Sequence, residues 1–371
     1  MQDHDDSDRL VAAVQAARAA GTPLTLLGSG SKRARFPDLQ PSAGAALSTA
    51  EHVGVIYYAP DELVLEARAG TPLAAISEAL AERGQQLAFE PPRFGAGGTL
   101  GGAIAAGLGG PARPWAGAPR DAVLGVELLN GHGEPLRFGG RVVKNVAGYD
   151  IARLQAGAFG TFGCLLSVAL RVMPQPPTTV TLTMRHEAET ALECLRDWSR
   201  YNLPLTGSCW SGGELMLRLA GPAAAVEQAT ARIRHETQAE VRDRPGFWAS
   251  LRDFAHPFFQ GPRETGGSAP ADRLYRASLP LGTPALDADA AGLLEWRGAQ
   301  RWYWLSATEV GAVAEQVRTR GGYLLPAADP GLTANRQPGV AAVADRLRSA
   351  FDPAGIFNPH LVHQPEATDA H

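Results

Sequence analysis

Hydrophobic and polar residues follow short, regular patterns along the first half of the chain. Apolar side chains at Leu10, Val14 and Ala17 recur at the spacing of one helix face, which predicts a helix over 8–20 that ends at Gly21. Further apolar runs predict strands over 23–27, 63–69 and 164–172. Helices and strands therefore alternate closely, which indicates a mixed α+β region.

Turn and cap signals add a helix and a hairpin to this region. Thr71-Pro72 is expected to cap and start a helix that ends at Gly84. The strand-like stretches 122–129 and 137–144 flank the turn Asn130-Gly131-His132-Gly133, and this arrangement predicts a β-hairpin.

Pro174-Gln175-Pro176-Pro177 marks a boundary after which the pattern changes. Strand, helix, strand, strand and helix are then predicted over 179–184, 187–200, 205–210, 214–219 and 222–235. This order is typical of a ferredoxin-like α+β unit. A weaker second round, without a visible sequence repeat, is predicted over 272–279 (strand), 285–294 (helix), 301–305 (strand), 308–319 (helix) and 322–325 (strand), followed by a helix over 340–350. We therefore expect an α+β protein with domains over 1–174 and 175–338 and a C-terminal segment over 339–371.

Composition restricts the class of protein. Hydrophobic residues make up 45% of the 371 residues and the formal net charge is −4, which fits a globular protein without a basic nucleic-acid surface. The uncharged run 94–112 is too rich in glycine for a membrane helix, and the acidic first residues are unlike a secretory signal. Cys164, Cys194 and Cys209 lack CxxC spacing, which favours a reducing cytoplasm and excludes an iron–sulfur cluster held by this chain alone.

Two lysines stand out because the 34 basic residues include only Lys32 and Lys144 as lysine. Both lie in glycine-rich segments, 28–32 and 143–150, and a compact ammonium group suits contact with a phosphate or a polar ring atom. Chance retention on a solvated surface is the alternative for either lysine alone. Asp150, at the end of the second segment, is expected to cap a short helix over 151–155.

The glycine pattern excludes two common nucleotide motifs. Arg33 stands where a dinucleotide-binding fingerprint would have its third glycine, and no acidic residue follows about 20 positions on. A P-loop is excluded because no Gly-Lys-Ser/Thr completes its spacing. The 18 glycines within 95–163 suit instead a long ligand with a pyrophosphate, such as FAD, because glycine turns can aim backbone amides at an anion. A tightly packed loop over 97–110 is the alternative explanation.

The order of these segments resembles the FAD-binding domain shared by vanillyl-alcohol oxidase and p-cresol methylhydroxylase (PCMH). Within that family, the chain is similar to the FAD-binding E subunits of bacterial glycolate oxidases. The resemblance is strong over about 10–175, weak beyond that, and resumes at the C-terminal motif. The segments that carry it are 23–32, 90–92, 98–102, 107–111, 113–115, 120–121, 144–150, 157–163 and 351–359.

The resemblance implies a two-subdomain PCMH-type FAD-binding domain, followed by the cap domain, with the C-terminal segment returning to the FAD domain. It also implies a set of cofactor-binding residues. The first pyrophosphate loop would comprise Gly28, Ser29, Gly30, Ser31 and Lys32. The pyrophosphate and the flavin would be approached from the other side by Thr99, Leu100, Gly101 and Gly102. Other implied residues are Arg120, Asp121, Lys144, Asn145, Gly148, Tyr149, Asp150, Gly157, Gly160 and Gly163, with Asn358 near the flavin. Because Ser31 and Lys32 stand where many covalent members carry a histidine, non-covalent FAD is expected.

Because a flavin carries the redox chemistry, the protein supplies position, charge and proton transfer. For a 2-hydroxyacid, an arginine would bind the carboxylate and a base would take the hydroxyl proton. Arg276, on the strand predicted over 272–279, is the candidate catalytic residue, and a structural salt bridge is the alternative. His256 and His360 are candidate bases. No His-x-x-x-His pattern predicts a metal site.

The resemblance implies an FAD-binding subunit of a multi-subunit glycolate (2-hydroxyacid) oxidase or dehydrogenase that takes part in oxidising glycolate to glyoxylate. Its implied partners are a catalytic FAD-containing subunit and an iron–sulfur subunit. The expected location is the cytoplasm, or the inner membrane periphery through those partners, with no transmembrane segment of its own. The clustered cap histidines of catalytic members have no counterpart here. Two alternatives therefore stay open: a structural FAD-carrying assembly subunit, and an autonomous FAD-dependent oxidase of another hydroxylated substrate.

Overall fold

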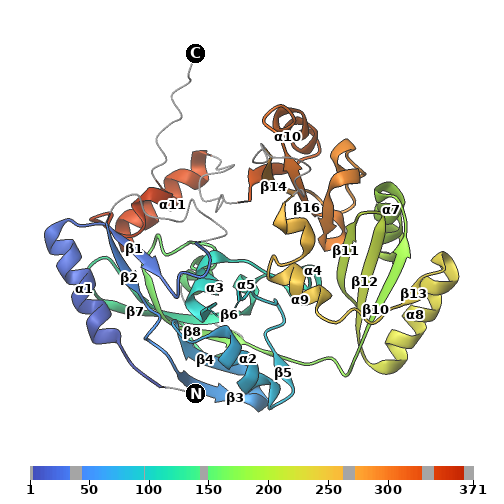
Figure 1. Ribbon diagram of the computed structural model, residues 1–371. Coiled ribbons are helices and arrows are strands. Elements are labelled where there is room, and N and C mark those ends of the chain that lie inside the picture. Colours follow the sequence, from blue (N-terminus) through green and yellow to red (C-terminus); the bar gives the residue numbers. More distant parts are fainter. Residues whose placement is uncertain are drawn as a thin grey trace. The chain divides into compact units, whose positions relative to one another are not determined.

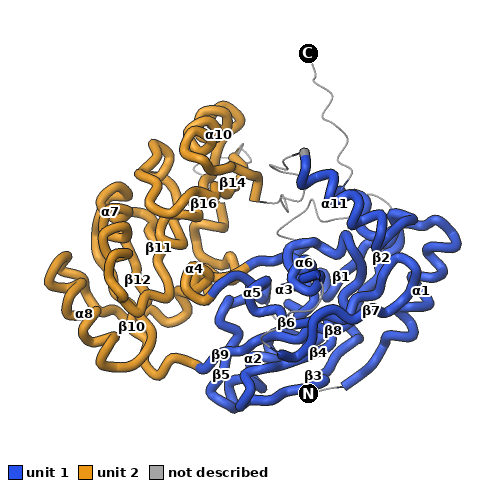
Figure 2. The backbone as a smooth tube through the Cα atoms, turned by 180° about the vertical axis from the view of Figure 1, so that it is seen from behind, with its two compact units in different colours: residues 1–108, 117–174, 328–371 blue, residues 109–116, 175–327 orange. Residues whose placement is uncertain are grey.

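The computed structural model describes residues 3–33, 44–95, 97–142, 149–261, 272–327 and 338–362. The chain forms two compact units, which Figure 1 and Figure 2 show in ribbon and tube form. Unit 1 comprises residues 1–108, 117–174 and 328–371, and unit 2 comprises residues 109–116 and 175–327. The C-terminal segment therefore belongs to the same unit as the N-terminal half, and the short segment 109–116 belongs with the later half.

Unit 1 is built around an antiparallel sheet of five strands in the order β3-β4-β8-β6-β7. The strands are β3 (Val55–Ala59), β4 (Val64–Arg68), β6 (Val123–Leu129), β7 (Pro135–Gly139) and β8 (Cys164–Arg171). β8 is buried along nearly its whole length because it is the central strand, which explains its continuous apolar run. Two smaller pairs accompany this sheet: parallel β1 (Leu24–Leu27) with β2 (Ala45–Ser48), and β5 (Gln85–Gln86) with β9 (Met173–Pro174).

The helices of unit 1 pack on these sheets through their apolar faces. They are α1 (Ser7–Ala20), α2 (Leu73–Ala81), α3 (Leu100–Ala106), α5 (Pro119–Ala122), α6 (Ile151–Leu154) and α11 (Pro338–Phe351), with 3-10 turns η2 (Pro60–Glu62) and η6 (Pro359–Leu361). Residues of α2 and α3 such as Ile76 and Ile104 are buried in one core cluster with Leu65 of β4. α1 buries its predicted face in a second cluster that contains Phe357 of the C-terminal segment. Full burial of each such side chain stabilises the fold by roughly 1.5–3 kcal/mol.

Two local predictions in unit 1 are wrong. Thr71 does not cap α2, because its Oγ1 hydrogen bonds with the backbone of Gly54 instead (3.0 Å to N, 3.2 Å to O). The second hairpin strand lies over 135–139, and residues 140–142 of the predicted range 137–144 are not strand, while residues 143–144 lie outside the described residues. The strand ends at Gly139, where φ is +72° and an added Cβ would lie 2.2 Å from the Leu124 carbonyl oxygen. The hairpin itself, the cap by Asp150 and the helix over 8–20 are confirmed.

Unit 2 contains one antiparallel sheet of eight strands in the order β13-β10-β12-β11-β15-β16-β14-β17. Its first four strands are β10 (Thr178–Arg185), β11 (Leu205–Ser211), β12 (Glu214–Gly221) and β13 (Glu240–Val241), with helices α7 (Ala188–Trp198) and α8 (Ala223–Thr237). The other four are β14 (Arg273–Ser278), β15 (Leu293–Glu295), β16 (Gln300–Leu305) and β17 (Tyr323–Pro326), with helix α10 (Val310–Thr319). The remaining elements are α4 (Arg113–Ala116), α9 (Phe247–Arg252), η3 (Pro257–Gln260), η4 (Asp287–Ala291) and η5 (Trp296–Gly298).

The two halves of this sheet share one topology. The strands of each half can be numbered by their order along the chain and read from the outer edge of the sheet inward. Both halves then have the order 4-1-3-2, and the two second strands, β11 and β15, pair with each other at the junction. This confirms the predicted ferredoxin-like order of the first half. The second half repeats the same strand order without a sequence repeat, but its predicted first helix is not formed.

The helix predicted over 285–294 is wrong. A 3-10 turn occupies 287–291, and after Gly292 strand β15 begins at Leu293. The carboxylate of Asp289 accepts from Leu286 N (2.8 Å) and the hydroxyl of Tyr303 (2.7 Å), and it pairs with Arg301. These buried contacts fix the short turn, so tertiary structure overrides the helical preference of this alanine-rich stretch.

Candidate functional site

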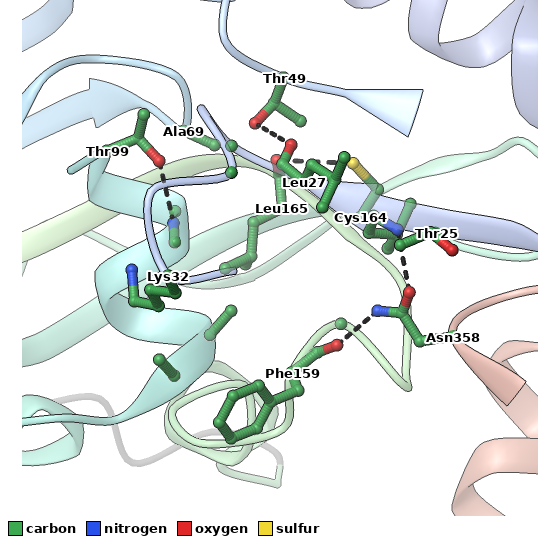
Figure 3. Close-up of a pocket in the computed structure, with 18 of the residues that line it drawn as sticks. Thr25, Leu27, Lys32, Thr49, Ala69, Thr99, Phe159, Cys164, Leu165 and Asn358 are labelled. Carbon is green, nitrogen blue, oxygen red and sulfur yellow. Dashed lines mark hydrogen bonds between the residues drawn. The ribbon is translucent and has the colours of Figure 1, made fainter. Parts of the chain in front are cut away.

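Unit 1 contains a cavity where several chain segments meet (Figure 3). They are the end of β1 with the loop after it, one face of α3, the stretch 159–165 and the C-terminal stretch 358–361. The cavity brings together many of the residues expected to bind the cofactor: Gly28, Ser29, Gly30, Ser31, Lys32, Thr99, Gly101, Gly102, Gly160, Gly163 and Asn358.

The loop 28–32 presents backbone amides to this cavity. β1 pairs with β2 up to Leu27, and the Ser48 hydroxyl holds the loop's first carbonyl, Gly28 O (2.9 Å). Gly30 then adopts φ +75°, which a residue without Cβ reaches at no steric cost. Among the described residues, the N–H groups of residues 29–32 form no hydrogen bond. Four successive free amides of this kind suit an anionic ligand.

The start of α3 lines the cavity but does not offer free amides in the same way. Leu100 N donates to Thr71 O (2.9 Å), Gly101 N to Ala69 O (2.8 Å) and Gly102 N to the Thr99 hydroxyl (3.3 Å). Gly101 is required for close packing, because an added Cβ would lie 2.7 Å from the Cβ of Ala69. The role of this segment is therefore to bring a helix very near the end of β4. Of these three amides, only that of Gly102 has a long hydrogen bond, which a ligand could replace.

Lys32 places its ammonium group at one end of the cavity, beside α3. A Cβ added to Gly102 would lie 3.4 Å from Lys32 Nζ, and the Phe94 ring centroid lies 5.4 Å from the same atom. No carboxylate pairs with Lys32 among the described residues. Desolvation therefore lowers the pKa of this lysine to about 8. A charged amine without a counterion is a further indication of an anionic ligand.

Arg33 lines the same cavity, and the sequence analysis did not include it among the binding residues. Its Nε atom is buried and has no hydrogen-bond partner in the described part of the chain. The only signal for this residue in the sequence is that it is the second consecutive basic residue after the glycine loop, at a position where a dinucleotide fingerprint would have glycine.

Asn358 lies on the other side of the cavity from Lys32 in Figure 3. Its Oδ1 accepts from Leu26 N (2.9 Å) and its Nδ2 donates to Phe159 O (2.6 Å). Its backbone N donates to Leu24 O (2.9 Å), and its φ of +45° is a left-handed value that asparagine tolerates. Asn358 therefore fastens the C-terminal segment to β1 and to the stretch 159–165.

Other expected residues lie elsewhere. Leu100 is fully buried in the core cluster of the sheet. Asp121 caps α5 by accepting from Ala118 N (2.8 Å), and the expected residues that do not line the cavity are Leu100, Arg120, Asp121, Tyr149, Asp150 and Gly157. Lys144, Asn145 and Gly148 lie outside the described residues.

The candidate residues for substrate chemistry are divided between the units. Arg276 is half-buried on β14 of unit 2, in register with Trp302 of β16. In the same unit, His256 Nδ1 accepts from Phe258 N (3.3 Å) and desolvation lowers the pKa of its ring. His360 lines the cavity of unit 1. In the described part of the chain, no group of three histidine, cysteine or acidic residues could hold a metal ion.

The cavity as a whole fits FAD. None of its described lining residues is acidic, whereas Lys32 and Arg33 stand beside four free amides at one end. Apolar side chains such as Leu26, Ala105 and Phe159 line the walls, as an aromatic ring system requires.

Comparisons with known proteins agree with this fit. The FAD binding domain family matches residues 4–139. The chain is 37% identical over 361 residues to the glycolate oxidase subunit GlcE of Escherichia coli, covering 97% of this chain and 98% of that protein. It is 38% identical over 89 residues to the glycolate oxidase subunit GlcD of Bacillus subtilis, covering 24% of this chain and 19% of that protein. A solved structure of alkyldihydroxyacetonephosphate synthase matches with a TM-score of 0.67 at 14% identity, over 96% of this chain and 74% of that one, which is a likeness of fold.

The fold and the cavity define an FAD-dependent oxidoreductase of α+β architecture. Its match to GlcE runs along nearly the whole of both chains. The chain belongs to the glycolate oxidase subunit GlcE family. No helix in the described ranges has the length and apolarity needed to cross a membrane.

Proposed function

We propose that this chain is the FAD-carrying subunit of a multi-subunit oxidase or dehydrogenase of glycolate or a similar small 2-hydroxyacid. Its partners are a second flavin-containing subunit and an iron–sulfur subunit, and the complex lies in the cytoplasm or on the inner face of the membrane. The near full-length similarity to GlcE carries this proposal, and the shorter similarity to GlcD supports a multi-subunit enzyme.

The cavity supports a division of labour within the site. FAD supplies the electron-accepting chemistry when it is bound. The loop 28–32 and Lys32 bind the pyrophosphate, while Asn358 holds together the segments that form the opposite wall. The absence of a cysteine cluster in the sequence fits electron transfer to a partner that carries the iron–sulfur centre.

The visible spectrum of the purified chain tests the cofactor. A yellow protein that releases its flavin into the supernatant on acid precipitation is expected, because nothing in the loop 28–32 replaces the histidine of covalent members. A colourless, folded protein that takes up no added FAD would contradict the proposal, and flavin retained in the precipitate would contradict non-covalent binding.

Glycolate added under anaerobic conditions tests the reaction. Bleaching of the flavin only in the presence of the partner subunits is expected. Bleaching of the isolated chain would support an autonomous oxidase instead, and a flavin that never changes during turnover of the complex would support a structural cofactor.

Arg276 is proposed to bind the substrate carboxylate. Arg276→Gln should raise the KM for glycolate in the complex at least tenfold while the flavin content stays unchanged, since losing a charge-assisted bond costs about 1.5–3 kcal/mol. Arg273→Gln, at an exposed position of the same strand, is the matched control. Equal KM values in both variants would remove Arg276 from the site.

A further inference from the structure

We propose that Arg33 is a second cation of the dinucleotide site, which binds the FAD pyrophosphate together with Lys32 and controls how firmly this chain retains its flavin. This inference rests on the proposed function, because it assigns a residue of this chain to the same cofactor.

The backbone turns sharply between the glycine loop and Arg33. Arg33 N donates to Gly30 O (3.0 Å), so the side chain of Arg33 returns toward the loop that it follows. Its Cδ would lie 3.7 Å from a Cβ on Gly30, and the residue lines the cavity beside Lys32. The turn therefore brings two neighbouring cations and the free amides of residues 29–32 to one end of the cavity.

The charges at this end are not balanced by the protein. No acidic side chain is among the described residues that line the cavity, and Arg33 Nε is buried without a hydrogen-bond partner in that set. Burying a charged donor in this state is unfavourable unless a ligand completes its hydrogen bonds. A pyrophosphate carries one negative charge on each phosphoryl group, so it can neutralise one cation with each group.

A structural role would require partners that other arginines of unit 1 have. Arg68 pairs with Asp5 (3.3 Å), Arg137 with Glu127 (3.0 Å) and Arg141 with Glu66 (2.5 Å). Arg33 differs from these three in having no carboxylate partner within the described ranges and in lining a cavity. Its position therefore favours a ligand contact over a packing contact.

The test compares Arg33→Gln and Arg33→Lys with wild type, after the flavin is removed and FAD is added back. Arg33→Gln should raise the dissociation constant for FAD roughly tenfold to a hundredfold, which is the range for loss of a charge-assisted hydrogen bond. FAD binding by this variant should also depend less on salt. Arg33→Lys, which keeps the positive charge, should lose less affinity for FAD than Arg33→Gln. Arg137→Gln, which removes an exposed arginine that pairs with Glu127 and does not line the cavity, should bind FAD within twofold of wild type.

ADP and riboflavin locate the effect, because only ADP carries the pyrophosphate. Arg33→Gln should weaken ADP binding by about the same factor as FAD binding and leave riboflavin binding unchanged. The ligand-free variant should unfold at a temperature no lower than wild type, because it loses a half-buried charge whose Nε has no partner among the described residues. If the flavin cannot be removed reversibly, the rate of flavin release from the purified holoprotein at rising salt gives the same comparison.

Three results would overturn the inference: FAD binding within twofold of wild type in Arg33→Gln, an equal loss for riboflavin, or a ligand-free variant that unfolds at a lower temperature. Each of these leaves the proposed function intact as long as wild type binds FAD. Failure of wild type itself to bind FAD would overturn the proposed function.

Discussion

Single residues decide the character of the cavity, and Lys32 shows how far one residue can be interpreted from sequence. Its rarity among 34 basic residues predicts a special position, and the structure places its ammonium group in a cavity without an acidic side chain among the described lining residues. The absence of a counterion could not be predicted, because it depends on which segments fold around the loop. For the same reason, only the folded structure shows that Arg33 Nε lacks a hydrogen-bond partner among the described residues and that the Thr71 hydroxyl bonds to Gly54.

Lys32 should make FAD binding dependent on pH. Because desolvation lowers the pKa of the ligand-free lysine to about 8, the affinity should stay constant between about pH 6 and pH 8 and weaken above that, by up to tenfold per pH unit. Lys32→Arg should abolish this dependence, because arginine stays charged throughout. Fluorescence titration with FAD at each pH measures the dissociation constant. The same pH dependence of that constant in wild type and in Lys32→Arg would contradict the assignment.

Asp289 should be the most sensitive acidic residue of unit 2. It is fully buried, paired with Arg301 and bonded to Tyr303. Asp289→Asn should therefore destabilise unit 2 by about 3–5 kcal/mol, the cost of leaving a buried charge without its partner. Asp287→Asn, at the exposed first residue of the same turn, is the control. Urea unfolding curves that shift by less than about 1 kcal/mol for Asp289→Asn would contradict this view of the network.

At the scale of elements, the apolar patterns predict most strands and helices correctly because each buries a continuous face. β8 and α1 are clear cases, since their apolar spacing matches their position in the core. Short elements fixed by distant partners escape such reasoning. β15 has three residues, and it is a strand because it pairs with β11 on one side and β16 on the other.

The contact between α3 and β4 provides a test with a matched pair of glycines. Gly101→Ala should cost about 1–3 kcal/mol and lower the flavin content, because the new Cβ would lie 2.7 Å from Ala69 Cβ and 3.1 Å from its carbonyl oxygen. Gly311→Ala in α10 has nothing within 4 Å of the new Cβ and should stabilise by about 0.5–1 kcal/mol. Thermal unfolding and flavin absorbance measure both. Equal shifts of the unfolding temperature in both variants would contradict this prediction, because they would mean that α3 can move away from β4 at no cost.

At the scale of the whole molecule, the two units should respond to acid through different histidines. Desolvation lowers the pKa of His52 in unit 1 and of His256 in unit 2. Because a lowered pKa means that the folded state binds fewer protons than the unfolded state, stability is present above about pH 6.5 and is lost as the pH falls below that value. His52→Gln should flatten this loss for unit 1 and His256→Gln for unit 2, as measured by calorimetry from pH 7 to pH 5. Exposed His235→Gln should change neither, and loss of the acid sensitivity in that control would refute the assignment.

One part of the interleaving of the two units, the membership of segment 109–116 in unit 2, could not be predicted from the sequence. A proline-rich boundary at 174–177 is visible, whereas the segment 109–116 carries no such signal. Its membership in unit 2 depends on contacts to residues far along the chain: Gly110 O accepts from Trp296 Nε1 (3.1 Å), and Arg113 stacks on the ring of Trp296 at 4.8 Å. Such contacts depend on three-dimensional packing, which local pattern does not encode.

The bond between Leu26 and Asn358 has a consequence for how the protein is made. The two residues are 332 positions apart, so a ribosome that adds about 5–20 residues per second reaches Asn358 roughly 20–70 s after Leu26. During that interval the nascent polypeptide lacks one wall of its flavin pocket. Prosthetic-group loading is therefore expected as a late event in biosynthesis, and products of premature termination before Asn358 should stay colourless.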